Sequence, residues 1–290
     1  MDFLSLFGAG LANGSLYALV ALGLMLVFKA QDVVNFAHGE LFMIGAFLAF
    51  TAFESLHLPY AVAFVVALAG SAAIGAVAER LTVRPLIASP RISIVMVTVG
   101  LSFALKGFAR IPWGADIYTF PPIFGAAPVR IGSLILSPQN IVTILFSVGL
   151  MVLFFLFFRF TTLGKQMRAT SQNQTGASIV GINVGRVFSI TWAAAAATGA
   201  AAGVLAAPIT LLYPEMGTKM LIKAFAAAVL GGFGSIPGAI VGGLAMGIIE
   251  ILSGAYVTTA LMDISAFLVI MVVLFIRPQG LFGVRAAARV

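Results

Sequence analysis

The chain has 290 residues, of which 61% are hydrophobic and only 9% are charged. A soluble globular domain carries about 25% charged residues, so this balance, with a mean hydropathy of +1.14, excludes a soluble protein and predicts an integral membrane protein. The absence of cysteine excludes disulfides, thiolate metal sites and cysteine nucleophiles, and the net charge of +7 lacks the basic stripe with exposed aromatics that nucleic acid binding needs.

Apolar runs follow one another along the chain. The first, from Phe3 to Phe28, is about 26 residues long, enough to cross roughly 30 Å of hydrocarbon. The later runs are Leu41 to Phe53, Ser55 to Ala78, Ile92 to Leu105, Ile131 to Phe158, Val187 to Pro214, Ala224 to Ile249 and Ile264 to Ile276. Several are too short for a simple span, so we expect about nine crossings, or eight if one short run is re-entrant. The predicted fold is an all-α, polytopic helical membrane protein with a single transmembrane domain, residues 1–290.

The distribution of Lys and Arg predicts the orientation. Residues 80–91, 159–186 and 277–289 are basic and nearly free of acid, as cytoplasmic segments are. We therefore expect the C-terminus in the cytoplasm, and the N-terminus and a loop of about residues 106–139 outside. A chain that is outside near residue 214 and inside at residue 277 needs an odd number of crossings between these points, and we expect three.

The first polar cluster is the stretch "VNFAHGE", residues 34–40, between two apolar runs. Ionisable residues inside a membrane are functional candidates. In one interpretation, Asn35, His38 and Glu40 fix a bend between helices, with Gly39 permitting the turn, and meet interfacial water. In the other interpretation, the bend lines a translocation pathway.

The segment Thr161 to Arg186 is the long hydrophilic stretch of the chain. It lies in a cytoplasmic loop predicted over about residues 159–187. Its length suits a short helix parallel to the membrane, followed by a turn at Gly181. The alternative is a solvated basic loop.

A glycine-rich stretch, "GGFGSIPG" at residues 231–238, interrupts the apolar sequence near the C-terminus. Irregular backbone at membrane depth is tolerated where it is buried in protein or lines a cavity, so Gly231, Gly232, Gly234 and Ser235 are candidates for the pathway. The alternative is a plain cytoplasmic turn. Other glycines recur at four-residue spacing, such as Gly10 with Gly14 and Gly243 with Gly247, which predicts close helix packing.

No catalytic or metal-binding motif is present in the sequence. Neither His38 nor His57 belongs to an HExxH zinc motif. Residues 100–104 depart from the nucleophile elbow at their last position, and Gly164-Lys165 lacks the upstream glycine of a phosphate-binding loop. The chain is therefore not expected to be an enzyme, and any ATP that drives it binds to another polypeptide.

Four separated motifs resemble one known family, the permease subunits of ABC importers for branched-chain amino acids (Liv family, LivH type). They are "GLANGSLYALVALGLMLVFKAQDVVNFAHGELFMIGAF", "MRATSQNQTGASIVGINVGR", "AFAAAVLGGFGSIPGAIVGGLAMGIIE" and "LFIRPQGLFG". The second is similar to the loop that docks into the ATPase in such permeases. The matching positions are Met167, Arg168, Ala169, Gly181, Ile182 and Asn183. Asn173 and Thr175 stand where acidic residues are common in the family, so this loop is uniformly basic.

The resemblance implies a multi-subunit importer in the bacterial inner membrane. Its other parts would be a second permease subunit forming a heterodimer, two ATPase subunits that bind ATP and Mg, and an external binding protein that delivers substrate. Urea, short amides or other amino acids are alternative substrates. An ion-coupled secondary transporter, with Glu40, Glu250 and Asp263 as coupling acids, is a second class, and an intramembrane hydrolase built on Ser235 is a third.

Overall fold

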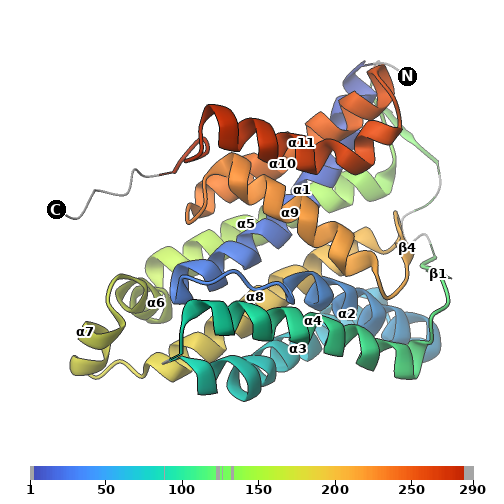
Figure 1. Cartoon of the computed structure of the whole chain (residues 1–290). Coiled ribbons are helices and arrows are strands. Elements are labelled where there is room, and N and C mark those ends of the chain that lie inside the picture. The colour runs from blue at the N-terminus through green and yellow to red at the C-terminus, as the bar shows by residue number, and fades with distance from the viewer. Residues whose placement is uncertain (1–2, 88, 122–124, 126, 132–133, 284–290) are drawn as a thin grey trace.

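The structure, a computed structural model, describes residues 3–87, 89–121, 125, 127–131 and 134–283. Helices make up 79% of it, and two small antiparallel sheets of two strands each complete it. The prediction of an all-α, polytopic helical membrane protein is therefore confirmed. Figure 1 shows long helices that run across the molecule side by side.

The helices are α1 Phe3–Gln31, α2 His38–Phe50, α3 Tyr60–Ala78, α4 Arg91–Trp113, α5 Pro138–Phe160, α6 Thr162–Gln172, α7 Gln174–Ile179, α8 Val184–Ala206, α9 Met216–Gly231, α10 Ile236–Tyr256 and α11 Ala260–Ile276. The strands are β1 Tyr118–Thr119, β2 Val129–Ile131, β3 Leu134–Leu136 and β4 Leu211–Leu212. β1 pairs with β4 and β2 with β3, both antiparallel.

Six helices are long and apolar enough to cross a membrane: α1, α3 with the turns that extend it to Leu86, α4, α5, α8 and α10. Three further helices are shorter, α2 with 13 residues, α9 with 16 and α11 with 17. Together these nine helices contain the apolar runs from which eight or nine crossings were predicted. The three expected between residues 214 and 277 correspond to α9, α10 and α11.

Two boundaries differ from the sequence prediction. α4 continues to Trp113, although Lys106 was expected to begin the outer loop, because Lys106 and Arg110 each find a carboxylate partner elsewhere in the fold. The loop therefore begins at residue 114. The run expected from Ile131 instead starts with the hairpin of β2 and β3, and the helix begins at Pro138 with Ser137 as its N-cap.

Helix α1 forms the centre of the bundle, and 83% of its apolar window is buried. Its close approach to α10 depends on glycine. A Cβ on Gly14 would lie 2.8 Å from the Leu244 Cα, and one on Gly10 would lie 2.9 Å from the Ile248 Cα. Without these side chains the two backbones pack directly, as small residues allow in lipid. The four-residue glycine spacing therefore has the packing role predicted for it, and it acts within this subunit.

The two ends of the bundle differ in character. The α6–α7 pair and the end of α11 lie at the left end in Figure 1, and β1 and β4 lie at the right. Aromatic side chains gather at the strand end, where the Trp113 ring stacks on Phe47 with centroids 4.9 Å apart and Trp113 Nε1 donates to Thr51 Oγ1 at 2.8 Å. Such aromatic rings are enriched at membrane interfaces.

Candidate functional site

The stretch 34–40 carries the chain from the end of α1 back into the interior. α1 ends at Gln31, the backbone reverses at Asp32 with φ of 55°, and α2 begins at His38. His38 Nε2 lies 3.0 Å from the Val20 carbonyl oxygen, to which it donates. Because Val20 lies well inside α1, the start of α2 lies deep in the bundle.

Asn35 forms the turn that precedes α2. Its Oδ1 accepts a hydrogen bond from the Ala37 amide at 2.9 Å, and the Phe36 amide donates to Thr98 Oγ1 of α4 at 3.2 Å. The side chains of Asn35 and His38 are exposed by 1% or less. They therefore fix the bend, and the expected contact with interfacial water is wrong, since the fold buries them.

Glu40 joins three helices in the interior. Its Oε1 accepts hydrogen bonds from Ser102 Oγ of α4 at 3.0 Å and from Thr218 Oγ1 of α9 at 3.2 Å, and Lys106 Nζ lies 3.4 Å away. The residue has no solvent exposure, and its Oε2 has no hydrogen-bond partner among the described residues. A buried carboxylate is stable when it is paired and hydrogen-bonded, so Glu40 holds α2, α4 and α9 together.

The N-termini of two short helices meet at this point. A Cβ on Gly39 would lie 2.8 Å from the Leu221 Cβ, and one on Gly217 would lie 2.7 Å from Glu40 Oε2. Short helices that start inside a bundle are a common feature of transporter substrate sites, where their positive dipole ends face polar groups. Sequence analysis identified Glu40 but not its partners on α4 and α9.

The glycine-rich stretch 231–235 forms the turn between α9 and α10. Gly232 and Gly234 have φ of 105° and 86°, and Ser235 Oγ accepts from the Gly238 amide at 3.1 Å as the N-cap of α10. The turn lies beside Lys29 at the basic end of the bundle, because one shallow pocket there is lined by Phe28, Lys29 and Gly234, among others. This position at the end of the bundle is that of a turn that connects two helices.

The same turn receives the C-terminal segment. The amides of Leu281 and Phe282 donate to the carbonyls of Leu230 and Gly231, both at 2.9 Å. A Cβ on Gly232 would lie 2.9 Å from the Gln279 carbonyl oxygen. Glycine is therefore needed here for a close backbone contact as well as for its positive φ.

The predicted ATPase-docking residues separate into two groups. Met167 is buried at 3% exposure and Ala169 is half-buried, while Arg168 donates to the carbonyls of Phe158 and Arg159 at the end of α5. These residues attach α6 to the bundle. Lys, Arg or His near a helix C-terminus satisfies its last carbonyls in this way.

The second group is exposed at the tip of the loop. Gly181, with φ of 85°, and Asn183 are exposed, and Ile182 is half-buried. Sequence analysis missed their neighbours Ile179 and Val180, which are 79% and 75% exposed. The sequence feature that could have identified them is their adjacency, because two large apolar residues stand side by side inside a polar segment.

Asparagine caps both helices that flank this tip. Asn173 Oδ1 accepts from the Gly176 amide at 2.8 Å at the start of α7, and Asn183 Oδ1 accepts from the Arg186 amide at 3.0 Å at the start of α8. Asn and Asp are about equally good N-caps. Asn173 is therefore as good a cap at this position as an acidic residue would be.

Among the residues that the structure describes, no group of three or more His, Asp or Glu side chains is placed to hold a metal ion. The interior instead carries single polar contacts, chiefly those of His38 and Glu40, and a buried ion pair of Lys223 Nζ with Glu250 Oε1 at 2.6 Å.

Comparison with known proteins reveals similarity along nearly the whole chain. The family model described as "Branched-chain amino acid transport system / permease component" matches residues 6–276. The chain is 34% identical over 288 residues to the high-affinity branched-chain amino acid transport system permease protein LivH of Escherichia coli K12, covering 94% of this chain and 93% of LivH. It is 32% identical over 291 residues to the corresponding protein BraD of Pseudomonas aeruginosa, covering 94% of each chain.

A solved structure, PsaBC from Streptococcus pneumoniae in complex with Fab, aligns with a TM-score of 0.49 and 15% identity, covering 93% of this chain and 91% of that one. The family model and the identity to LivH confirm the family that the sequence motifs resembled, whose members are membrane permease subunits and not enzymes. This chain belongs to the family of permease components of branched-chain amino acid transport systems.

Proposed function

We propose that the chain is the membrane-spanning permease subunit of an ATP-driven importer of branched-chain amino acids. The observation that carries this proposal is the similarity to LivH and BraD over 94% of the chain. The importer would contain a second permease subunit as a heterodimeric partner, two cytoplasmic ATPase subunits that bind ATP and Mg, and an external binding protein.

Reconstituted proteoliposomes test this function. The chain assembled with the partner permease, the ATPases and the leucine-loaded binding protein should take up leucine only when ATP is supplied. The isolated chain should take up none. Leucine uptake by the isolated chain driven by a proton gradient would overturn the proposal in favour of a secondary transporter. ATP-dependent uptake of urea or amides, with no uptake of leucine, would show that the importer transports these solutes in place of branched-chain amino acids.

The proposal includes an orientation in the bacterial inner membrane. One end of the bundle carries a cluster of basic residues: Lys29, Arg80, Arg84, Arg91, Arg159, Lys165, Arg168, Arg186 and Arg277. The positive-inside bias places such an end in the cytoplasm. The α6–α7 loop and the end of α11 would then lie inside, and the start of α1 outside.

The absence of native cysteine makes this orientation easy to test by labelling. Ala115 and Ser178 are both exposed, at opposite ends of the bundle. A membrane-impermeant maleimide added to intact cells should label Ala115→Cys and leave Ser178→Cys unlabelled until the membrane is permeabilised. The reverse pattern would overturn the orientation and the docking assignment with it.

The tip of the α6–α7 loop is the surface that we expect the ATPase subunit to contact. Ile179 and Val180 form an exposed apolar patch, and such patches mark sites of protein–protein contact because their exposure to water is unfavourable. Ile179→Asp should abolish co-purification of the ATPases while leaving the amount of membrane-inserted chain unchanged. Gln174→Asp, an equal charge on an exposed position of the same loop, is the matched control and should retain the ATPases.

A further inference from the structure

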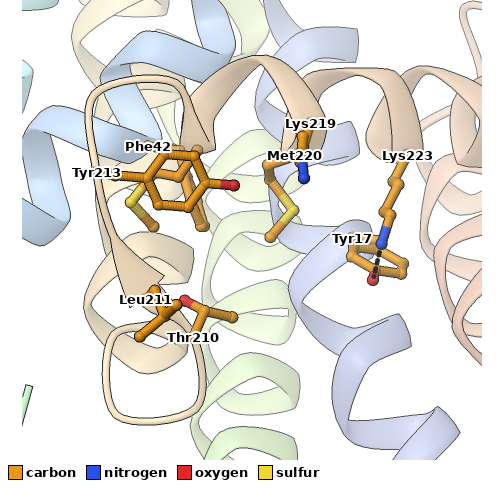
Figure 2. Close-up of a pocket in the computed structure, with 9 residues that line it drawn as sticks. Tyr17, Phe42, Thr210, Leu211, Tyr213, Lys219, Met220 and Lys223 are labelled. Atoms are coloured by element: carbon orange, nitrogen blue, oxygen red, sulfur yellow. Dashed lines mark hydrogen bonds between the residues drawn. The ribbon is translucent and has the colours of Figure 1, made fainter. Parts of the chain in front are cut away.

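A cavity of about 270 Å³ opens beside α9. Its lining comes from α1, α2, α9 and the segment that precedes α9 (Figure 2). The lining residues are Tyr17, Phe42, Thr210, Leu211, Tyr213, Met216, Lys219, Met220 and Lys223. Pockets for drug-sized ligands measure roughly 300–1,000 Å³, so this cavity suits a smaller solute.

One wall of the cavity is apolar and well packed. Phe42, Met216 and Met220 line it and are exposed by 1%, 6% and 8%. Methionine side chains are flexible and polarisable, so they fit apolar groups of different shapes. This wall therefore suits aliphatic side chains that branch at different positions.

Two lysines one helical turn apart give the cavity its charge. Lys223 Nζ lies 2.6 Å from Glu250 Oε1 and 3.4 Å from the Tyr17 hydroxyl, so its charge is balanced by a buried carboxylate. Lys219 Nζ has no carboxylate within 4 Å among the described residues. Figure 2 shows the Tyr213 hydroxyl directed towards the side of the cavity that carries Lys219, and Lys223 directed towards Tyr17. The cavity thus carries one unbalanced positive charge.

Lys219 lines the cavity and is exposed, so its ammonium can bind an anionic group that enters there. The cavity also offers oxygen acceptors opposite this cation. Thr210 Oγ1 donates its hydrogen to the Ala206 carbonyl at 3.1 Å, which leaves its oxygen lone pairs free to accept. An apolar wall, one cation and hydroxyl acceptors are complementary to the aliphatic side chain, carboxylate and ammonium group of an apolar amino acid.

We infer that this cavity is a transient binding site for the translocated amino acid, in which Lys219 binds the carboxylate and Phe42, Met216 and Met220 contact the side chain. The inference rests on the proposed function, which supplies the substrate class. The Lys223–Glu250 pair keeps the second lysine neutralised, so that a single carboxylate balances the site.

The first experiment measures leucine transported per ATP hydrolysed by the assembled importer with saturating loaded binding protein. Lys219→Met should lower this ratio about tenfold or more, the factor expected for a lost hydrogen bond to a charged group, while ATP hydrolysis stimulated by the binding protein persists. Lys219→Arg should keep most of the ratio. An unchanged ratio in Lys219→Met would overturn the role of Lys219 in binding the carboxylate. If the importer without any substitution transported no leucine, the proposed function itself would be refuted.

The second experiment probes the cavity directly in the assembled importer. Leu211→Cys places a thiol on an exposed lining residue, and Val129→Cys places one on an exposed residue of the separate β2–β3 hairpin. Millimolar leucine should slow maleimide labelling at residue 211 but not at residue 129. Leucinol, which lacks the carboxylate, should leave labelling at residue 211 unchanged. Equal protection by leucinol, or protection by phosphatidylglycerol in place of leucine, would overturn the carboxylate assignment.

Discussion

The Glu40 cluster provides a quantitative test of what holds the interior together. Lys106 Nζ and Glu40 Oε1 are 3.4 Å apart, and two unit charges at that distance attract by about 5 kcal/mol at an effective dielectric constant of about 20. Lys106→Met leaves the carboxylate buried without its cation, which costs about 3–5 kcal/mol. Because the Lys106 side chain is 17% exposed, and Ser102 and Thr218 still donate to Glu40, we expect a value near 3 kcal/mol.

A double-mutant cycle measures this loss. The free energy of unfolding of each variant is determined in mixed detergent micelles, with the helical circular dichroism signal as the measure of folded protein. Glu40→Gln combined with Lys106→Met should cost less than Lys106→Met alone, because no buried charge is left unpaired. Arg110→Met is the matched control on the same helix, since it removes a half-exposed ion pair with Glu215 and should cost below about 1 kcal/mol. The structural role of Glu40 would be refuted if Lys106→Met and Arg110→Met lowered the free energy of unfolding equally, and if the effects of Glu40→Gln and Lys106→Met were additive in the double mutant.

Three further substitutions test other parts of the structure. Gly217→Val should prevent accumulation of monodisperse protein, since a Cβ there would lie 2.7 Å from the α2 backbone, whereas Gly149→Ala, with open space around it, should purify normally. Gly181→Asp should insert at normal levels on a membrane immunoblot, because an added Cβ would have no other atom within 4 Å. It should lose ATP-driven leucine uptake, because φ of 85° strains a side chain at this position of the loop tip. Arg84→Met removes the cation beside buried Glu79 and should lower the unfolding free energy by about 3 kcal/mol in the same micelle assay.

The helical architecture could be predicted because most of the apolar helices have an apolar run of their own. α9 and α10 share the run from Ala224 to Ile249, which the glycine-rich stretch divides. Helix ends were less predictable, since they depend on partners far away in the sequence. α4 continues through Lys106 because Glu40 lies 66 positions earlier and pairs with it, and nothing in the local sequence reveals that pairing. The apolar run begins at Ala224, but α9 starts at Met216 and includes Lys223, which pairs with Glu250 inside the bundle.

The candidate residues divide in the same way. Glu40 could be selected as an acid in an apolar setting, and Gly181 as a turn in a polar loop. The burial of Met167 could not be predicted, because it depends on how α6 packs against the membrane helices. The significance of Lys219 was also hidden, since a lysine at the edge of an apolar run resembles an ordinary helix end until its neighbour Lys223 is seen to be paired.

Helix α8 connects the tip of the α6–α7 loop with the helices around the proposed binding cavity. It begins directly after the loop tip, capped by Asn183, and its first turns are held by Arg84, which donates to the Gly185 carbonyl at 2.6 Å. Farther along, α8 and α2 have no space between them, because a Cβ on Gly45 would lie 2.5 Å from the Ala200 Cβ. We therefore expect α8 and α2 to move together.

The start of α2 bonds to α9 through Glu40 and Thr218, and the next residue of α9 is Lys219. We expect a movement imposed on the exposed loop at the basic end to reach the cavity through α8, α2 and the buried Glu40 carboxylate. Packed interfaces of this kind shift between discrete arrangements because they do not deform continuously. We therefore expect the same Glu40 contacts that stabilise this fold to determine how α9 and Lys219 respond to force at the α6–α7 loop.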